Sequence, residues 1–511
     1  MSAANRLSSA LAAARNAAPD GPALIFNGEH YSWRWMADRG RALTEALSAA
    51  GVPDDAPIGL IPRNRPLFVA TLLELLITGR SIVMIYAFQS GEAIARDIEA
   101  LRLSAVIADR QDWTEEALAA AHSVGTAAIR LDPSAPADAG ITRIAGVQRC
   151  GPGPHRGPFP VAGIEMLTSG TTGTPKRLAM DFDLIFRAMV GESIVLEKPD
   201  PGQAVTPGLM IYPFGNISGL YTFLPLAAAG LPTLLLEKFD VDGWLAYVKQ
   251  YRPARAGLPP AGIQMVLDAD IPPEDLSSIE ALHSGAARLD PHVQAQFEQR
   301  YGIPVLLAYG ATEFGGPVSN MTLEDVRAFG PAKFGSVGRA WAGAQLRVLD
   351  PETLEELPPG AEGLLEVSTP RMGDHWIRTT DLAMIDEDGF LFHRGRADGA
   401  ISRGGFKILP EVVASALQTH PSVAAAAVVG MADRRLGQVP VAAIELRPGA
   451  PIPSTAELSA HARRTLYTTH VPTRFVIVDA LPRTPSLKIS IPGVAALFEQ
   501  QEETPVRETG Q

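Results

Sequence analysis

One short segment concentrates hydroxyl and glycine residues just before a lysine. Residues 165–180 have the sequence EMLTSGTTGTPKRLAM. Glycines let backbone N–H groups approach an anion closely, while the hydroxyls add donors and the lysine adds charge. The candidate anion-binding residues are Thr168, Ser169, Gly170, Thr171, Thr172, Gly173 and Lys176. This pattern predicts a phosphate-binding loop.

The spacing in this loop separates it from a better-known phosphate loop. The lysine follows as G-x-x-G-x-x-K, whereas a Walker A loop requires G-x-x-x-x-G-K-[ST]. A flexible Ser/Thr/Gly linker is the alternative, although linkers rarely end in Pro-Lys between two regular elements. The segment IEMLTS predicts a strand before the loop, and the apolar spacing after residue 181 predicts a helix beyond it.

The surrounding sequence predicts the elements that hold this loop. Apolar strand-like runs alternate with helical patterns through residues 1–397, which indicates an α/β fold with a large N-terminal domain of sheets flanked by helices. Residues 398–498 predict a small α+β C-terminal domain, and the polar residues 499–511 predict a disordered tail. The Gly-rich, charged segment GRADGAISRGG joins the two domains as a hinge would.

Several element boundaries follow from local signals. Asp290 and Pro291 predict a helix start, and Gly302 predicts its end before a buried strand that reaches Gly310. Ser454 and Glu457 predict a capping box in the small domain. The apolar residues 218–237 are predicted to form a buried helix and a buried strand, separated by Pro225, Gly230 and Pro232.

Composition excludes several classes of protein. The chain has 511 residues, 46% of them hydrophobic and 20% charged, with a formal net charge of −12. An acidic chain of this kind is not expected to bind nucleic acid. A single cysteine, Cys150, rules out an intrachain disulfide framework and suggests a cytoplasmic location. No uninterrupted apolar stretch predicts a membrane span, and the ten histidines show no metal-ligand spacing.

Five segments together resemble one known family. LTSGTTGTPK closely resembles the phosphate-loop signature of the adenylate-forming superfamily, which contains acyl-CoA synthetases, peptide-synthetase adenylation domains and firefly-type luciferases. Four further segments resemble its other motifs in the same order. They are YGATE at 309–313, TTD at 379–381, GRADGAISRGGFKILPEVV at 395–413 and LPRTPSLKIS at 481–490. The resemblance spans nearly the whole chain and is greatest to AMP-forming acyl-CoA ligases.

The resemblance implies a two-step reaction. ATP and a carboxylic acid form an acyl-adenylate and pyrophosphate, and a nucleophile, often the thiol of coenzyme A, then displaces AMP. Lys488 would bridge the attacking carboxylate and the α-phosphate, and Thr312 would donate to that phosphate. Glu313 would hold Mg²⁺. The ordinary alternatives are a surface lysine and a solvated loop glutamate.

The resemblance also implies a nucleotide site. The adenine would lie between the Tyr309–Gly310 segment and a loop formed by Ser284, Gly285 and Ala286. Asp381 and Arg396 would bind the ribose, their alternative being an exposed salt bridge. Asp398 would be the hinge about which the small domain moves as a lid. Gly404 and Gly405 would border the channel for the coenzyme A arm.

The acyl pocket and the acceptor are less closely defined. Asn216, Ile217, Phe314 and Gly315 are expected to line an apolar pocket for an aromatic, medium-chain or polycyclic acid. The chain departs from the family pattern at Arg177, Thr380 and Leu487, where glycine is usual, and at Asn216, where histidine is frequent. The acceptor could therefore be an amine or a carrier-protein thiol, or the chain could be a catalytically idle relative. A homodimer is also compatible with the sequence.

Overall fold

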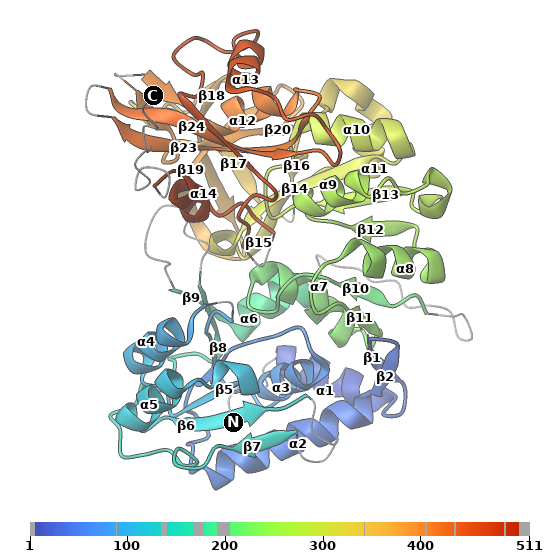
Figure 1. The fold of residues 1–511 in the computed structure, drawn as a ribbon. Coiled ribbons are helices and arrows are strands. Elements are labelled where there is room, and N and C mark those ends of the chain that lie inside the picture. The colour runs from blue at the N-terminus through green and yellow to red at the C-terminus, as the bar shows by residue number, and fades with distance from the viewer. Residues whose placement is uncertain are drawn as a thin grey trace. The chain divides into compact units, whose positions relative to one another are not determined.

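The computed structural model describes residues 6–87, 89–133, 140–167, 177–191, 205–341, 343–403, 406–433, 436–484 and 487–499. The chain forms two compact units (Figure 1). The first comprises Met1–Tyr247 and Ala311–Gly316, and the second comprises Val248–Gly310 and Pro317–Gln511. Among the described helices, none has the length and apolar character needed to cross a lipid bilayer.

The first unit is built on a seven-stranded sheet with the order β7-β6-β5-β3-β4-β8-β9. Its five inner strands are parallel, and β7 and β9 are antiparallel to their neighbours. The strands are β3 (Ile58–Leu60), β4 (Ile82–Met84), β5 (Ala105–Asp109), β6 (Ala127–Leu131), β7 (Ile141–Arg143), β8 (Gly163–Leu167) and β9 (Arg177–Asp181). The short β-branched and apolar runs of β3 and β4 are fully buried, as expected for a parallel sheet covered on both faces.

Helices cover this sheet as the alternation of patterns predicts. Helix α4 packs against α5, while α3 packs against α1 and α2. The helices are α1 (Arg6–Ala17), α2 (Trp33–Ala49), α3 (Pro66–Ile77), α4 (Gly91–Leu101), α5 (Glu115–Val124), α6 (Phe182–Ile185) and α7 (Ile217–Ala228), with the short turns η1 (Arg110–Asp112) and η2 (Phe186–Val190). Nearly all of α3 is buried, which explains its continuous apolar sequence.

A second sheet of this unit has the order β10-β11-β1-β2. Its strands are β1 (Pro22–Phe26), β2 (Glu29–Ser32), β10 (Gly208–Met210) and β11 (Thr233–Leu235). The predicted helix and strand within residues 218–237 are present as α7 and β11. Pro225, however, lies inside α7, and the helix ends near Gly230, which has a φ of +70°. Pro225 was therefore wrongly predicted as a break.

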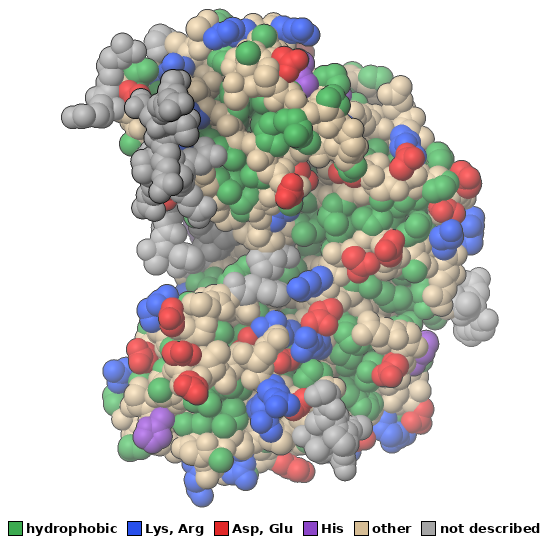
Figure 2. Space-filling model, viewed as in Figure 1, with side chains coloured by type: hydrophobic (Ala, Val, Ile, Leu, Met, Phe, Trp, Pro, Cys, Tyr) green, Lys and Arg blue, Asp and Glu red, His purple; other side chains and the backbone are tan. Residues whose placement is uncertain are grey.

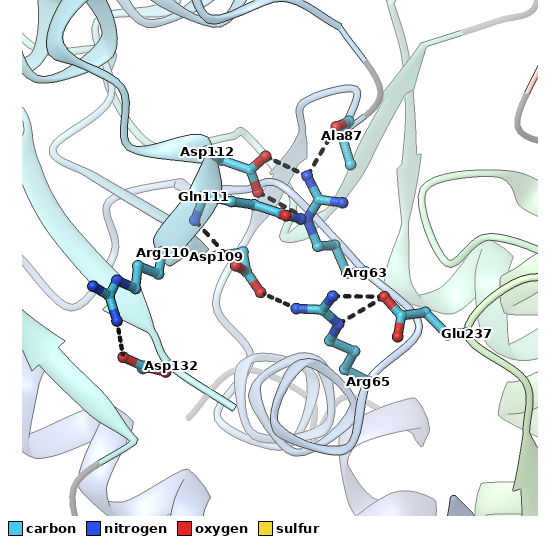
Figure 3. Close-up of polar contacts among 9 residues, drawn as sticks. All are labelled: Arg63, Arg65, Ala87, Asp109, Arg110, Gln111, Asp112, Asp132 and Glu237. Carbon is cyan, nitrogen blue, oxygen red and sulfur yellow. Dashed lines mark hydrogen bonds and ion pairs between the residues drawn. The ribbon is translucent and has the colours of Figure 1, made fainter. Parts of the chain in front are cut away.

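A network of partly buried ion pairs joins the loops at the carboxyl ends of β3, β5 and β11 (Figure 3). Arg63 pairs with Asp112, and Arg65 pairs with both Asp109 and Glu237 at 2.7 Å. Asp109 and Asp112 are buried, and a buried charge is tolerated only when it is paired and hydrogen-bonded. The network therefore fixes these loops against one another.

The second unit contains a mixed sheet with the order β12-β13-β14-β15-β16. Strands β12, β13 and β14 are parallel, so their carboxyl ends lie at one edge. The strands are β12 (Arg255–Gly257), β13 (Ala281–Ser284), β14 (Val305–Ala311), β15 (Gly316–Asn320) and β16 (Arg339–Ala340). The accompanying helices are α9 (Pro260–Asp268), α10 (Pro291–Tyr301) and α11 (Leu323–Phe329), with turns η3 (Pro273–Leu276) and η5 (Gly330–Lys333). Helix α8 (Val241–Tyr251) begins in the first unit, to which the turn η4 (Thr312–Phe314) also belongs.

An antiparallel sheet, β17-β18-β19-β20, follows in the chain. Its strands are β17 (Gln345–Leu349), β18 (Glu362–Thr369), β19 (Gly373–Ile385) and β20 (Leu391–Arg396). Residues 398–498, the predicted lid, contain β21 (Ile401–Arg403), β22 (Phe406–Ile408), β23 (Val423–Asp433), β24 (Gly437–Leu446) and β25 (Arg474–Val478), with α12 (Pro410–Gln418) and α13 (Thr455–Ala462); α14 (Ile491–Glu499) follows them.

The lid sheet buries both of its faces. On β23, Ala426 and Val428 join a core cluster with residues of α12 and α13, whereas Ala427 and Val429 join a second cluster with residues of α14. Successive side chains of a strand point to opposite faces, so the run of small apolar residues in β23 serves two layers. The domain boundary at residue 397 itself remains a prediction.

Most local signals are confirmed. Asp290 caps α10 by accepting from the N–H of His292, and Gly302 ends that helix in the left-handed conformation. Ser454 and Glu457 form the predicted capping box of α13. On the face shown in Figure 2, basic and acidic side chains are interspersed among the described residues, with no continuous basic surface.

Candidate active site

The predicted phosphate loop, including Thr168, Ser169, Gly170, Thr171, Thr172, Gly173 and Lys176, lies outside the described residues. Its two flanks are defined, because Leu167 of β8 pairs with Arg177 of β9 in an antiparallel arrangement. The loop therefore connects two strands, and the prediction that it leads directly into a helix was wrong. The alternating apolar side chains Leu178 and Met180 were the signal for β9, and α6 begins only at Phe182.

Arg177 anchors the base of this loop. Its guanidinium donates to the carbonyl oxygen of Met84 at 3.0 Å and lies 3.7 Å from both Asp97 and Glu165. Glu165 is buried and also receives two hydrogen bonds from Arg156. Burial lowers the pKa of Arg177, and the two carboxylates oppose that effect. An arginine at this position thus ties the loop to the ends of β4 and β8.

The carboxyl ends of β13 and β14 bring two predicted nucleotide-binding segments to one edge. The parallel register pairs Ser284 with Leu307, so the loop after Ser284 lies near Tyr309. A Cβ atom at Gly285 would be 3.3 Å from the carbonyl oxygen of Ala308, which shows a close approach. Ser284 is buried, and its hydroxyl has no partner among the described residues. Ala286 has a φ of +68°, and Gly310 is exposed.

Asp381 is held by two aromatic side chains. The Tyr309 hydroxyl donates to Asp381 Oδ2, and His393 Nε2 lies 3.5 Å from Asp381 Oδ1. Burial raises the pKa of Asp381, but the hydrogen bonds from His393 and Tyr309 and the charge of Arg396 outweigh burial, so its pKa lies below the ordinary value. Burial and the neighbouring carboxylate raise the pKa of Tyr309 well above its ordinary range. The pair therefore consists of a carboxylate acceptor and a phenol donor.

Arg396 lies beside Asp381. Its Nη1 is 3.8 Å from Asp381 Oδ1, across the register pair that joins β19 to β20. Arg396 also donates to both carboxylate oxygens of Asp398, at 2.9 and 2.7 Å. The predicted hinge residue Asp398 is thus hydrogen-bonded to Arg396, a predicted ribose-binding residue.

Thr312, Glu313 and Phe314 form the turn η4 directly after β14, in the first unit. Phe314 is buried, Glu313 is exposed, and Gly315 closes the turn with a φ of +70°. The described residues contain no group of three or more His, Cys, Asp or Glu that could hold a metal ion. The role of Glu313 in holding Mg²⁺ remains a prediction.

Asn216 occupies the N-cap position of α7, and Ile217 is the first residue of that helix. Both are partly buried. The Asn216 side chain makes no capping hydrogen bond, although asparagine is a favoured capping residue. Their place in an acyl pocket remains a prediction.

Lys488 lies in a tight turn of the second unit. Its N–H donates to the Thr484 hydroxyl at 3.2 Å, and its carbonyl oxygen accepts from the Thr484 N–H at 2.7 Å. Leu487 has a φ of +61°, a conformation that favours glycine. This backbone conformation explains why glycine is usual at this position in the family. In this chain leucine adopts it. Gly404 and Gly405 lie outside the described residues.

Two family models match this chain. The AMP-binding enzyme model matches residues 11–374, and the AMP-binding enzyme C-terminal domain model matches residues 413–488. The chain belongs to the AMP-binding enzyme family. This is the adenylate-forming superfamily that the five sequence motifs resemble, and the match includes both Tyr309 and Lys488.

Similar AMP-binding enzymes include several ligases. The chain is 27% identical to a 2-succinylbenzoate–CoA ligase of Bacillus pumilus over 92% of this chain and 94% of that protein. It is 28% identical to a 4-coumarate–CoA ligase of Pinus taeda, over 63% of each chain.

Solved structures share the fold. The o-succinylbenzoate CoA synthetase of Bacillus subtilis, in complex with its acyl-adenylate intermediate, has a TM-score of 0.73 at 21% identity, covering 95% of this chain and 97% of that one. The amide bond synthetase McbA of Marinactinospora thermotolerans has a TM-score of 0.73 at 24% identity, covering 96% and 100%.

One residue of this AMP-binding enzyme was missed from its sequence. His393 was not assigned a role in the sequence analysis, yet its imidazole lies against both Tyr309 and Asp381. Its place three residues before Arg396 could have indicated that it belongs to the same site. In a regular strand, however, residues three apart point to opposite faces, so this signal pointed away from a shared site.

Proposed function

We propose that this chain is an AMP-forming acyl-CoA ligase. It would activate a carboxylic acid with ATP to an acyl-adenylate and pyrophosphate, and then transfer the acyl group to the thiol of coenzyme A. The observation that carries the proposal is the convergence of Tyr309, Asp381 and Arg396, which come from three different strands and three separate motifs. The ligases among the relatives support the same reaction.

These three residues suit a nucleoside. The ionised Asp381 can accept hydrogen bonds from both ribose hydroxyls, and Arg396 adds charge and donors beside it. The Tyr309 ring offers a face on which an adenine can stack. The loop from Ser284 to Ala286 would border the other side of the base, with the unpartnered Ser284 hydroxyl available as a donor or acceptor.

The first step joins two anions, so it requires positive charge near the α-phosphate. Lys488 would supply this charge, with Thr312 as a neutral donor, and the loop from Thr168 to Lys176 would hold the β- and γ-phosphates. Preorganised charges of this kind stabilise the transition state more than the substrates. Mg²⁺ near Glu313 would neutralise phosphate charge when it is bound.

The remaining features define the substrates more loosely. Phe314, Ile217 and Gly315 suit an apolar acid, and Asn216 would lie near its carboxylate. Coenzyme A would reach the adenylate past Gly404 and Gly405 after the lid turns about Asp398. A cytoplasmic location accords with the single half-buried Cys150.

The experiment is acid-dependent exchange of pyrophosphate into ATP, measured over a broad library of carboxylic acids. We expect exchange with at least one apolar acid. The variant Lys488→Ala is expected to lose about 100-fold or more of this rate, because the lysine acts mainly on the transition state. Lys238→Ala, which changes an exposed lysine, is the matched control and should retain the wild-type rate. Unchanged exchange in Lys488→Ala would show that a different cation performs this role.

A second acceptor class is favoured by one observation. Asn216 replaces the histidine frequent at this position, and its side chain is not used to cap α7. An amine could then take the acyl group instead of coenzyme A. With the best acid, separate incubations with coenzyme A and with primary amines distinguish the two. Amide formation without a thioester would overturn the thiol acceptor while leaving the adenylation step intact. No exchange with any acid would instead favour a catalytically idle relative.

A further inference from the structure

His393 lies against the two residues proposed to bind the nucleoside. Its ring stacks on Tyr309 with centroids 5.8 Å apart and an interplanar angle of 29°. Its Nε2 faces Asp381 Oδ1 at 3.5 Å, while the Tyr309 hydroxyl occupies Asp381 Oδ2. One imidazole therefore contacts both the aromatic face and the carboxylate.

A β-bulge places His393 on this face. The register pairs Asp381 with Arg396 and Leu382 with Gly395, but it then pairs Ala383 with His393. Arg394 is thus an extra residue on β20. Residues opposite each other share a face, so the bulge brings both His393 and Arg396 to the side of the sheet that carries Asp381. Without the extra residue, His393 would point to the other side.

The surroundings of the two ring nitrogens of His393 indicate which of them donates to Asp381. Its Nδ1 is buried and has no partner among the described residues. A buried N–H without an acceptor is rare, whereas an unpaired acceptor is better tolerated. A proton therefore belongs on Nε2, where it faces the Asp381 carboxylate.

We propose that His393 is a positioning residue for ribose recognition. Its Nε2–H and the Tyr309 hydroxyl each hold one oxygen of Asp381, so the remaining lone pairs of the carboxylate keep a fixed direction toward the sugar hydroxyls. Its ring also supports the Tyr309 ring from one side and leaves the other for the adenine. This inference rests on the proposed function, because it assumes that Asp381 binds a ribose.

The test compares the binding of AMP and of 2′,3′-dideoxy-AMP by isothermal titration calorimetry. Binding does not depend on turnover, so the assay works whichever acid or acceptor the enzyme uses. His393→Phe keeps an aromatic ring beside Tyr309 but removes the donor, whereas His393→Gln keeps a donor and removes the ring. His292→Phe, which changes a partly buried histidine on α10, is the control.

We expect the preference of wild type for AMP over the dideoxy nucleotide to fall about 5- to 10-fold in His393→Phe, which is the effect of losing one hydrogen bond of ordinary strength. His393→Gln should keep the preference within about 2- to 3-fold. His292→Phe should not change it. A merely structural role of His393 would weaken both nucleotides equally and leave their ratio unchanged.

Two results separate this inference from the proposed function. If Asp381→Ala keeps the wild-type preference, the ribose assignment itself fails. If Asp381→Ala abolishes the preference and His393→Phe keeps it, only the role of His393 is overturned. Equal losses in His393→Phe and His393→Gln would also overturn it. Should His393→Phe not fold, ¹⁵N NMR of histidine-labelled wild type provides the second measurement: an Nε2–H tautomer supports the inference, and an Nδ1–H tautomer contradicts it.

Discussion

At the scale of single residues, the candidate site depends on a carboxylate that stays ionised although it is partly buried. Asp381 remains ionised because His393, Tyr309 and Arg396 all stabilise its charged form. Tyr309 in turn remains a protonated donor, because burial and the same carboxylate raise its pKa. The two groups hold each other in the protonation states that nucleoside binding requires.

The lowered pKa of Asp381 predicts a pH-dependent contribution to stability. The folded-state pKa lies below the ordinary value of 3.8, so the ionised carboxylate stabilises the fold above that value and loses the effect as the pH falls through the folded-state pKa. Asp381→Asn is therefore expected to lower the free energy of unfolding at pH 7 and to differ less from wild type near pH 3. Urea unfolding at both pH values measures this. Asp479→Asn, which changes an exposed carboxylate, is the control for the loss of one negative charge. A constant difference between Asp381→Asn and wild type at the two pH values would contradict the prediction.

At the scale of elements, two contacts hold the strands that border the site. Arg177 ties β9 to the end of β4, and Gly395 lets β20 pass close to α12. Both positions lie next to a predicted binding residue, Lys176 in one case and Arg396 in the other. Each contact can be tested by a single substitution.

Arg177→Ala is expected to lower the free energy of unfolding by about 1–2 kcal/mol, since it removes a hydrogen bond and two ion-pair contacts at a partly buried position. It should also raise the KM for ATP more than the KM for the acid, because the phosphate loop ends at this residue. Thermal unfolding and steady-state kinetics measure the two effects. Arg187→Ala, at an exposed ion pair, serves as the control and should change stability little. Equal stability losses in the two variants would argue against an anchoring role.

Gly395→Ala is expected to destabilise the second unit by about 1–3 kcal/mol, the usual cost of a strained backbone conformation. Gly395 has a φ of +141°, and an added Cβ would lie 2.9 Å from Glu411 Oε2. Gly399→Ala is the control, since its Cβ would meet nothing closer than 3.7 Å and its φ is not left-handed. Differential scanning calorimetry compares the two, and an equal melting temperature for Gly395→Ala and wild type would refute this account.

At the scale of the whole molecule, the proposed reaction requires one chain to perform two chemical steps. The two family models match residues 11–374 and 413–488, and the predicted hinge Asp398 lies between them. Asp398 accepts hydrogen bonds from Arg396, so a rotation at the predicted hinge would alter a contact of the proposed nucleoside site. The lid has its own core on both faces of its sheet, which suits a part that moves as one body.

A proline at the hinge tests this motion. Asp398→Pro fixes φ and is expected to slow thioester formation at least 10-fold, while the adenylation rate changes much less. Asp398→Ala removes the same ion pair but keeps the backbone free, so the difference between the two variants isolates the rotation. Single-turnover measurements of each step provide the rates. Equal slowing of both steps by proline alone would contradict a hinge at this residue.

The sequence by itself determined the family, the α/β class and the identities of most proposed site residues. These follow from local information: the glycine and hydroxyl pattern before Lys176, the caps at Asp290 and Ser454, and motifs whose members lie close together in the chain. The roles of Thr312, Glu313 and Lys488 stay predictions, as do the acyl pocket and the domain boundary.

Only the tertiary structure decided how distant segments meet. The Tyr309 hydroxyl donates a hydrogen bond to Asp381, which lies 72 residues later in the sequence, and no local signal predicts that contact. The strand β9 was missed because a five-residue edge strand carries little pattern of its own. The bulge at Arg394 reverses the side on which His393 lies, and a bulge is fixed by pairing with the neighbouring strand β19. Side-chain direction in a sheet depends on register, and register is a property of two strands that one segment of sequence does not contain.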